Sequence, residues 1–331
     1  MGAHAPGYTG RMNGLHVVVT GATGNIGTSL IRLLSGDDRV ASILGVARRP
    51  PERRVPKTEF AVADLAEDEL DPLLEGRGAV VHLAWRMRPA RDPAATWHAN
   101  VIGSKRLFEA VARSEAKTLV HGSSVGAYSP RLDHRAVDES WPTDGWPGAA
   151  YTREKAYVER LLDLFEERHP NVRSVRIRPA FVFKRKAAAE QHRLFAGPLA
   201  PGRPRLVPAM PVVEGVRFQA VHADDLAEVF GSVLFGTASG AFNVAGESMT
   251  DMRSMAAMLG ARPVPMPFAA ARAALAVAWR ARMTPAPPEL LDIVTRLPVM
   301  DTGRVRRELG WVCHHTADEA FAEFIEGVRT G

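Results

Sequence analysis

Short hydrophobic runs alternate with longer stretches of helical periodicity from residue 15 onward. Three early runs have the length of strands, at Leu15–Thr20, Val40–Val46 and Phe60–Ala63. Between and after them, the spacing of apolar residues predicts helices at Thr28–Leu34 and Leu70–Leu74. Alternation of strands and helices predicts a parallel sheet, because parallel strands need a crossover connection.

The same rhythm continues to about residue 180. In chain order it predicts the strand Ala79–Leu83, the helix Val101–Ala112, the strand Thr118–His121, the helix Tyr151–Glu167 and the strand Ser174–Ile177. This order is typical of the α/β class. We expect a doubly wound parallel sheet of the Rossmann type, with helices on both faces.

The pattern changes after residue 183. Prolines and basic residues crowd positions 184–211, and the rhythm resumes with a strand at Phe218–Val221 and a helix at Asp225–Leu234. Ala241–Val244 is expected to be the last strand, and the remainder is predicted to be mostly helical. The expected division is a disordered lead at 1–13, a doubly wound domain over 14–183 with 217–246 returning to it, and a smaller lid formed by 184–216 and 247–331.

Composition narrows the possible classes. The chain is 46% hydrophobic and 24% charged, which is ordinary for a globular protein. Its formal net charge is +5, but lysines and arginines are dispersed and no aromatic-basic motif accompanies them. We therefore expect no nucleic-acid partner, and assign the excess positive charge to a pocket for an anionic cofactor or substrate.

Cysteine content and hydropathy indicate the compartment. Cys313 is the single cysteine, so an internal disulfide is impossible and a reducing, cytoplasmic location is expected. No run of about 18 apolar residues occurs, so a membrane span is not expected. The apolar segment Phe268–Trp279 is short and interrupted by Arg272, which favours a lid helix packed on its neighbour over membrane contact.

A glycine-rich turn is the strongest local chemical signal. The stretch Gly21-Ala22-Thr23-Gly24-Asn25-Ile26-Gly27 follows a predicted strand and opens a predicted helix. Glycines allow the backbone to turn tightly and approach a pyrophosphate at the helix N-terminus. The alternative is a purely structural turn. The expected cofactor contacts are Gly21, Thr23, Gly24, Asn25, Ile26 and Gly27.

Residues after the second and third strands would choose the dinucleotide. An acid after the second strand would bind the ribose 2′-hydroxyl of NAD, but Arg48 and Arg49 stand there instead. These arginines favour the 2′-phosphate of NADP, with NAD as the alternative and a solvated arginine pair as the bland explanation. After the third strand, Asp64 and Leu65 are expected to contact the adenine, although Asp64 would equally cap the following helix.

A tyrosine and a lysine carry the predicted catalytic chemistry. Tyr151 and Lys155 lie four residues apart and so share one helix face. An ammonium near a phenol lowers the phenol's pKa, so the pair would exchange a proton with a substrate oxygen. Ser124 follows the strand Thr118–His121 and would hold that oxygen, unless it only satisfies backbone groups.

Taken together, these motifs resemble the extended short-chain dehydrogenase/reductase family, the NAD(P)-dependent epimerase/dehydratase group, from Leu15 to about Trp311. The matching stretches are Thr20–Gly27, Asp64, His82-Leu83-Ala84, Asn100-Val101-Ile102-Gly103, Ser123–Tyr128, Tyr151 with Lys155, Arg178-Pro179, Val221–Ala227, Asn243-Val244 and Glu308–Trp311. The resemblance implies that Ser124, Tyr151, Lys155 and Asn100 form the catalytic set. It also implies cofactor contacts from Leu83, Ala84, Tyr151, Lys155 and Pro179.

Three departures from the family pattern bear on the substrate. Val125 and Gly126 replace the acidic pair of the family's dehydratases, which argues against sugar dehydration. Trp85 replaces the usual last alanine of H-L-A-A and is expected to narrow the pocket. Lys184 and Arg185 stand where nucleotide-sugar enzymes commonly have a glycine-proline step.

Other side chains suggest a substrate that is anionic or aromatic. A basic set around residue 184 would grip a phosphate or carboxylate, unless it is a solvated face; it comprises Lys184, Arg185, Lys186, Arg193, Arg203 and Arg205. Trp141 and Trp146 precede Tyr151 and would either wall an aromatic substrate or plug a loop. Cys313-His314-His315 is not expected to bind a metal, because adjacent side chains converge poorly.

The sequence therefore predicts an NADP(H)-dependent carbonyl reductase or alcohol dehydrogenase that acts on a small molecule. One alternative is a nucleotide-sugar epimerase, which would oxidise and re-reduce its substrate on tightly bound NAD. Another is a dinucleotide-sensing binding protein without catalysis. A homodimer is common among members of this family and is compatible with the sequence.

Overall fold

The structure is a computed structural model that describes residues 14–49, 51, 54–87, 92–188, 208–284 and 286–330. The predicted disordered lead at 1–13 lies outside the described residues, as do Arg193, Arg203 and Arg205 of the basic set.

A seven-stranded sheet forms the centre of the molecule, in the order β11-β7-β5-β4-β1-β2-β3. Every neighbouring pair in it is parallel. The strands are β1 (Leu15–Thr20), β2 (Val40–Ala47), β3 (Thr58–Val62), β4 (Ala79–His82), β5 (Thr118–Gly122), β7 (Arg173–Pro179) and β11 (Gly240–Val244). The strand order reverses between β1 and β4, which is where ligands bind in open sheets of this kind. The predicted Rossmann-type fold is confirmed.

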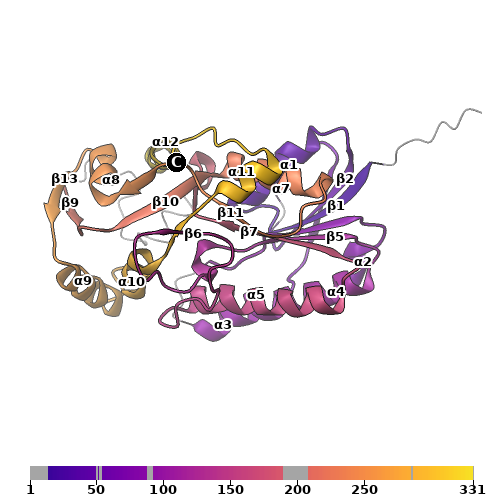
Figure 1. Ribbon diagram of the computed structural model, residues 1–331, viewed down its shortest axis with the longest axis horizontal. Coiled ribbons are helices and arrows are strands. Elements are labelled where there is room, and N and C mark those ends of the chain that lie inside the picture. Colours follow the sequence, from indigo (N-terminus) through magenta and orange to yellow (C-terminus); the bar gives the residue numbers. More distant parts are fainter. Residues whose placement is uncertain are drawn as a thin grey trace, which may run out of the picture.

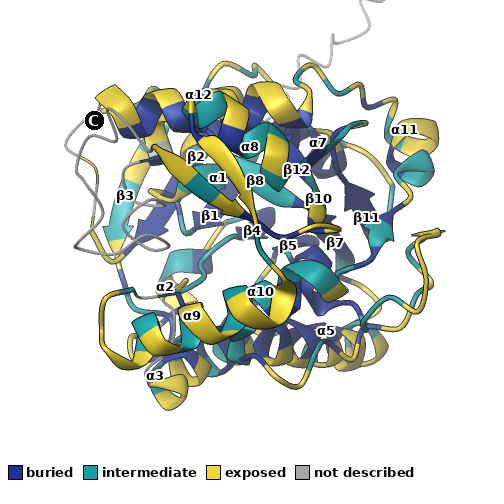
Figure 2. Ribbon diagram, turned by 90° about the vertical axis from the view of Figure 1, so that its left-hand side faces the viewer, coloured by how far each residue is buried: buried dark blue, intermediate teal, exposed yellow. Residues whose placement is uncertain are grey.

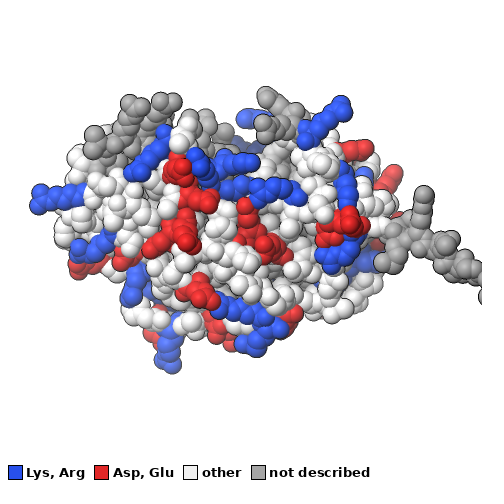
Figure 3. Space-filling model, turned by 90° about the horizontal axis from the view of Figure 1, so that it is seen from above, with Lys and Arg blue, Asp and Glu red and all other residues white. Residues whose placement is uncertain are grey.

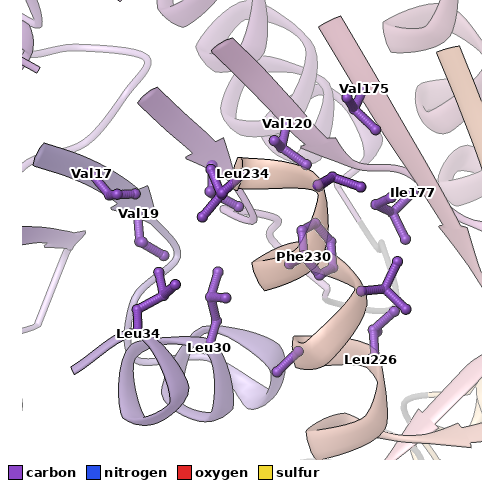
Figure 4. Packing of buried hydrophobic residues seen from close by; sticks show 14 of the residues in the cluster. Val17, Val19, Leu30, Leu34, Val120, Val175, Ile177, Leu226, Phe230 and Leu234 are labelled. Atoms are coloured by element: carbon purple, nitrogen blue, oxygen red, sulfur yellow. The ribbon is translucent and has the colours of Figure 1, made fainter. Parts of the chain in front are cut away.

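Helices cover both faces of this sheet because buried side chains alternate along each strand (Figure 1). Val17 and Val19 of β1 face α1 (Asn25–Ser35) and α7 (Ala223–Phe235), where Leu30 and Phe230 complete the core (Figure 4). Val18 faces the opposite layer. That layer consists of α2 (Asp71–Leu74), α4 (Gly103–Arg113) and α5 (Ala150–Arg168).

The remaining strands form smaller sheets. A three-stranded sheet comprises β8 (Phe181–Phe183), β10 (Arg217–His222) and β12 (Met249–Asp251), while β9 (Ala209–Val212) pairs with β13 (Arg262–Pro265) and β6 (Ala136–Val137) with β14 (Val299–Met300). The helices are α3 (Pro93–Trp97), α8 (Met252–Leu259), α9 (Phe268–Arg280), α10 (Glu289–Arg296), α11 (Gly303–Leu309) and α12 (Ala317–Thr330). The expectation that Ala241–Val244 is the last strand is wrong, because β12, β13 and β14 follow it. These strands have two to four residues, too few for a periodic signal.

The strands of the main sheet point toward the end of the molecule that carries α8, α9 and α10 (Figure 1). Figure 2 views this end and shows buried strands behind a largely exposed α9. Seen from above, basic and acidic side chains lie interspersed, without one continuous basic field on that face (Figure 3). Among the described residues, no helix combines the length and apolarity that crossing a bilayer requires.

Candidate active site

Two glycines of the turn are required by close backbone approaches. Gly21 has a φ of +68°, and a Cβ added there would lie 2.6 Å from the backbone nitrogen of Ala84. A Cβ on Gly27 would lie 2.3 Å from the carbonyl oxygen of Gly21. Gly24 is exposed, and its only near neighbour would be that same oxygen at 3.2 Å. The turn therefore folds tightly under the end of β4 and leaves Thr23 and Gly24 open to a ligand.

The start of α1 has unused hydrogen-bonding capacity. Gly24 caps the helix without a side-chain hydrogen bond, so the first-turn N–H groups keep their partial positive charge. The side chain of Asn25 donates to the Val182 carbonyl at 3.1 Å, but its buried Oδ1 has no partner among the described residues. Free N–H groups at a helix N-terminus suit a pyrophosphate. The residues of this turn thus fit the phosphates of a dinucleotide.

Lys184 adds a positive charge to the same helix. It is buried, and its Nζ donates to the hydroxyls of Thr28 at 2.9 Å and Ser29 at 2.8 Å. Burial lowers the pKa of Lys184 to about 8. Its neighbour Arg185 pairs with Glu326 at 3.0 Å. The basic run is therefore not one solvated face: Lys184 is packed against α1, and Arg185 is tied to α12.

The predicted adenosine contacts lie beside this turn. The backbone N–H of Ala22 donates to Val46 at 3.3 Å, which brings the end of β2, with exposed Arg48 and Arg49, next to the glycines. Neither arginine forms an ion pair among the described residues. Asp64 accepts from the backbone N–H of Ala66 at 3.0 Å, so it caps the turn after β3 and not a helix, because α2 begins only at Asp71.

Leu65 and the end of β4 complete this wall. Leu65 is buried, and its Cβ would lie 3.3 Å from a Cβ placed on Gly103. The backbone N–H groups of Leu83 and Ala84 donate to the carbonyl and the hydroxyl of Thr20, at 3.2 and 3.3 Å. These bonds fix the segment after β4 directly over the glycine turn.

His82 locks β4 to its neighbours. One ring nitrogen lies 2.8 Å from the Thr20 hydroxyl and the other 2.9 Å from the Ser104 hydroxyl on α4. Complete burial lowers the pKa of His82 to about 3, so the ring is neutral at physiological pH. This residue positions the sheet edge without carrying charge into it.

Ser124, Tyr151 and Lys155 come together at the end of β5. The Tyr151 hydroxyl donates to Ser124 Oγ at 2.8 Å, and Lys155 Nζ donates to the Gly122 carbonyl at 2.8 Å. Ser124 Oγ also accepts from the backbone N–H of Gly126 at 3.0 Å. A Cβ on Gly126 would lie 2.7 Å from the Tyr151 ring. Gly126, which replaces an acid of the dehydratase pattern, thus leaves the space into which the Tyr151 ring packs.

The protonation of the pair differs from the sequence-based expectation. Burial raises the pKa of Tyr151 to about 12, with the Ser124 hydrogen bond acting in the opposite direction. Burial lowers the pKa of Lys155 to about 7, against the raising effects of Glu159 and Glu154. The expectation that Lys155 lowers the tyrosine pKa is wrong for this structure. The reason is burial of the phenol, and the ammonium is directed at a carbonyl and an indole ring rather than at the phenol.

That indole belongs to Trp85. Lys155 Nζ lies 3.5 Å from the centre of the Trp85 ring, and the Tyr151 ring meets it edge-on at 6.1 Å between centroids. Its buried Nε1 has no acceptor among the described residues. Trp85 follows Ala84, so a single segment connects the glycine turn to the tyrosine and lysine. The tryptophan forms a wall shared by both parts of the site and leaves a donor for a bound molecule.

Asn100 is a positioning residue in this geometry. It sits in the π-helical turn His98–Ile102, so helical backbone precedes Val101, where the sequence predicted the helix to start. Its amide donates to Glu154 Oε2 at 2.7 Å and its Oδ1 accepts from the Arg86 backbone at 2.7 Å. It therefore ties the segment after Trp85 to α5.

Two buried glutamates on α5 were missed by the sequence analysis. Glu154 accepts from Asn100 and, at 2.6 Å, from Thr96. Its position three residues after Tyr151, on the stripe that continues to Val158 and Leu162, was the available signal. Glu159 is fully buried on the same helix.

Glu159 joins the ends of β5 and β7. Its carboxylate accepts from the Ser123 hydroxyl at 2.6 Å, from Arg176 at 3.0 Å and twice from Arg178 at 2.9 Å. The two arginines and Ser123 hold the pKa of Glu159 at about 2, although burial alone would raise it. Pro179, a predicted cofactor contact, is the last residue of β7 and directly follows Arg178.

The two tryptophans that precede Tyr151 have structural explanations. Trp141 donates to the Ser129 carbonyl at 3.1 Å and packs on buried Val125 and Tyr128, which favours the loop plug over a substrate wall. Trp146 packs against Gly148, whose Cβ would meet the indole at 2.3 Å.

His222, His315 and Glu323 bring potential metal donors within 4.8 Å of one another. Nδ1 of His222 accepts the backbone N–H of Asp224 at 3.2 Å, so its other nitrogen carries the proton and faces Glu323. His315 donates to Asp225 at 2.8 Å. His315 is therefore engaged by Asp225, whereas the buried Nε2 of His222 has no hydrogen-bond partner among the described residues.

Comparison with known proteins gives one family match. A model described as the NAD dependent epimerase/dehydratase family matches residues 17–245. An uncharacterised protein of Mycobacterium tuberculosis is 24% identical over 94% of this chain and 83% of its own length. A UDP-glucose 4-epimerase of Mycolicibacterium smegmatis is 30% identical, over 46% of this chain and 51% of that protein.

Solved structures agree on the fold. The UDP-glucose 4-epimerase of Thermus thermophilus, solved in complex with NAD, superimposes with a TM-score of 0.72 and 19% identity. The superposition covers 96% of this chain and all of that one (100%). At this identity the likeness establishes the architecture, including the position of the C-terminal elements.

Proposed function

The chain belongs to the NAD-dependent epimerase/dehydratase family, and from this premise we propose that it is an NAD(P)-dependent oxidoreductase. It would reduce a carbonyl or oxidise an alcohol of a small molecule. The observation that carries the proposal is the 2.8 Å hydrogen bond between Tyr151 and Ser124. The segment Ala84–Trp85 connects this pair to the glycine turn. The missing acids at Val125 and Gly126 argue against dehydration within the same family.

The dinucleotide would be held by residues of this chain that fit it. Its pyrophosphate would lie on the first turn of α1, above Gly21–Gly27, with its adenosine between the end of β2 and the Asp64–Leu65 turn. Leu83, Ala84, Lys155 and Pro179 would border the nicotinamide half. When bound, the dinucleotide supplies or accepts the hydride of the reaction.

The chain's own residues would handle the proton and the substrate oxygen. Ser124 would donate a hydrogen bond to that oxygen, and Tyr151 would pass a proton to it or take one from it. Lys155 would place positive charge near the phenol if its ammonium turned from the Trp85 face. Asn100 would act through Glu154 and Arg86, by fixing the helix that carries both groups.

The cofactor preference rests on Arg48 and Arg49. The exposed guanidiniums, without carboxylate partners in the described chain, support a 2′-phosphate and hence NADP. The Thermus epimerase structure was solved with NAD, so NAD is the alternative. Substituting both arginines with serine is expected to weaken NADP⁺ binding at least tenfold and leave NAD⁺ binding almost unchanged. Equal effects on both dinucleotides would favour NAD as the natural cofactor.

Two other functions remain distinguishable. A nucleotide-sugar epimerase, the activity named for the Mycolicibacterium relative, would interconvert substrate without net release of altered cofactor. A dinucleotide-sensing protein would bind cofactor and catalyse nothing, but Tyr151, Lys155 and Ser124 are all present, which supports catalysis.

Substitution of Tyr151 with phenylalanine tests the proposal. The hydroxyl is expected to matter only for turnover, so activity on a responsive carbonyl or alcohol should fall by about two to four orders of magnitude. Dinucleotide affinity, measured by titration calorimetry, should change less than about threefold. The control is Tyr157→Phe, an exposed tyrosine on the same helix. Unchanged turnover in Tyr151→Phe, or substrate interconversion without net cofactor oxidation, would contradict the assignment.

A further inference from the structure

Helix α9 exposes an apolar face that no other described element covers. None of its residues is buried. The outward positions recur every three to four residues and carry only small or branched apolar side chains: Ala269, Ala270, Ala273, Ala274 and Val277. Val277 is 64% exposed, and the flanking Phe268 and Met283 are 37% and 56% exposed. The helix contacts α10 through Arg272, as the sequence-based expectation of a packed lid helix requires, but this opposite face stays open.

One ion pair holds the helix to α10, although the Arg272 side chain is itself 43% exposed. Arg272, the one charged residue within the helix interior, forms a forked ion pair with Asp292 of α10, with both N–O distances 3.0 Å. Asp292 is 5% exposed. Leu275 and Trp279 are half-buried, so the largest apolar side chains within the helix face the protein, as in an ordinary surface helix. Val264, Phe268, Val277 and Met283 nevertheless remain exposed within this one segment. Such a concentration of exposed apolar side chains marks an interaction surface.

Charge identifies the kind of surface that would cover this face. From Met252 to Pro288 the sequence has five arginines and no Asp, Glu or Lys. Arg280 and Arg282 are exposed at the C-terminal end of the helix and form no ion pair within the described part of the chain. An apolar helix face bordered by unpaired arginines suits an interface in which hydrocarbon lies next to negative charge.

We propose that α9 docks this protein on the surface of an anionic lipid membrane. The helix would lie in the plane of the interface, with Val277 and the alanines among the upper acyl chains and Arg280 and Arg282 among the headgroups. This is peripheral contact and is compatible with the absence of a membrane-spanning helix in the described residues. It revises the sequence-based expectation that the segment avoids membranes.

A second copy of the chain fits the same face less well. A two-fold interface would place this patch against itself, with arginines of one copy near arginines of the other. Like charges brought together across an interface oppose association. A bilayer containing acidic lipids instead offers opposite charge and an apolar layer together.

The location of α9 determines which end of the docked molecule would face the membrane. The helix lies at the end of the molecule toward which the strands of the main sheet point (Figures 1 and 2). Ser124 follows β5 at that carboxyl edge. A docked molecule would therefore present this edge to the membrane side rather than to bulk water.

Vesicle co-sedimentation tests the proposal with the full-length protein. Vesicles of phosphatidylcholine with phosphatidylglycerol should bind it, vesicles of phosphatidylcholine alone should bind much less, and high salt should release it. Arg280→Gln and Arg282→Gln should each lower the partition coefficient about fivefold. Val277→Glu should abolish binding. Val62→Glu is the matched control, because Val62 on edge strand β3 is also 64% exposed.

Circular dichroism and thermal unfolding establish that each variant is folded, as expected at such exposed sites. Three results would overturn the proposal. One is wild-type protein that remains in the supernatant with both vesicle types. Another is Val277→Glu that binds as well as Val62→Glu. The third is a solution dimer that Val277→Glu dissociates, without vesicle binding, which would assign the face to a second copy.

Discussion

Replacing Glu159 with glutamine tests how the catalytic edge of the sheet is held together. The substitution preserves shape but removes the only carboxylate that pairs with Arg178 in the described chain. Arg176 retains Asp163 and Glu166, both at 2.6 Å, so Arg178 alone becomes an unpaired buried charge. Breaking a buried ion pair by removing one partner typically costs about 3 to 5 kcal/mol.

The pKa of Glu159 gives an independent magnitude. A decrease from 4.5 to about 2 corresponds to roughly 3 kcal/mol of stabilisation. Because the folded-state pKa is lowered, this contribution is fully present above pH 4.5 and is lost as pH falls toward 2. We expect Glu159→Gln to lose about 3 to 5 kcal/mol of unfolding free energy at pH 7. Its difference from wild type should shrink on acidification.

Urea unfolding followed by tryptophan fluorescence measures this loss. Asp163→Asn is the control: it removes a half-exposed acid from the same network and should cost less than about 1 kcal/mol. Adding Arg178→Met to Glu159→Gln should recover part of the loss, because it removes the unpaired charge. A loss below about 1 kcal/mol in Glu159→Gln, with m unchanged, would refute the view that Arg178 depends on this carboxylate.

Three further predictions rest on single contacts. Gly21→Ala should lose at least roughly 2 kcal/mol of stability, together with its dinucleotide affinity, because of the positive φ and the clash with Leu83 and Ala84. Gly24→Ala should keep most of its stability and its affinity. Equal effects of the two substitutions in calorimetry and urea unfolding would contradict this prediction. Without dinucleotide, Lys155→Met should be more stable than wild type at pH 7. This difference in unfolding free energy should narrow by up to about 1.4 kcal/mol per pH unit toward pH 10.5, because the unfolded lysine holds a proton in this range that the folded lysine has lost. A difference that does not change with pH in thermal unfolding would count against the lowered pKa. Trp85→Leu should lower the Lys155 pKa by up to about one unit, because it removes the cation–π contact. The pH dependence of lysine acylation measures this change. An unchanged profile would show that the indole does not stabilise the ammonium.

Most of the main sheet was predictable because buried parallel strands appear as continuous apolar runs. β1 was predicted with its exact bounds, and β4 and β5 to within one residue. Function-bearing positions at strand ends were equally accessible, since a parallel sheet brings all carboxyl ends to one edge. Ser124 and the glycine turn could therefore be placed together from the sequence alone.

The interactions that depend on distant side chains were not predictable. Glu159 looks like a solvated helix residue until Arg176 and Arg178 are known to lie beneath it. The Lys155 ammonium contacts Trp85, far earlier in the chain, and burial raises the pKa of Tyr151 against expectation. The exposed face of α9 was equally unpredictable, because the composition of a helix does not reveal which of its faces a neighbouring helix covers.

Gly126 limits how this scaffold can diversify. The Tyr151 ring occupies the space where any side chain at position 126 would begin. An acid introduced there, as in the dehydratase pattern, would displace the ring before it could act on a substrate. A change of reaction class in this lineage would therefore require at least two coordinated substitutions, one to supply the new group and one to reposition the tyrosine.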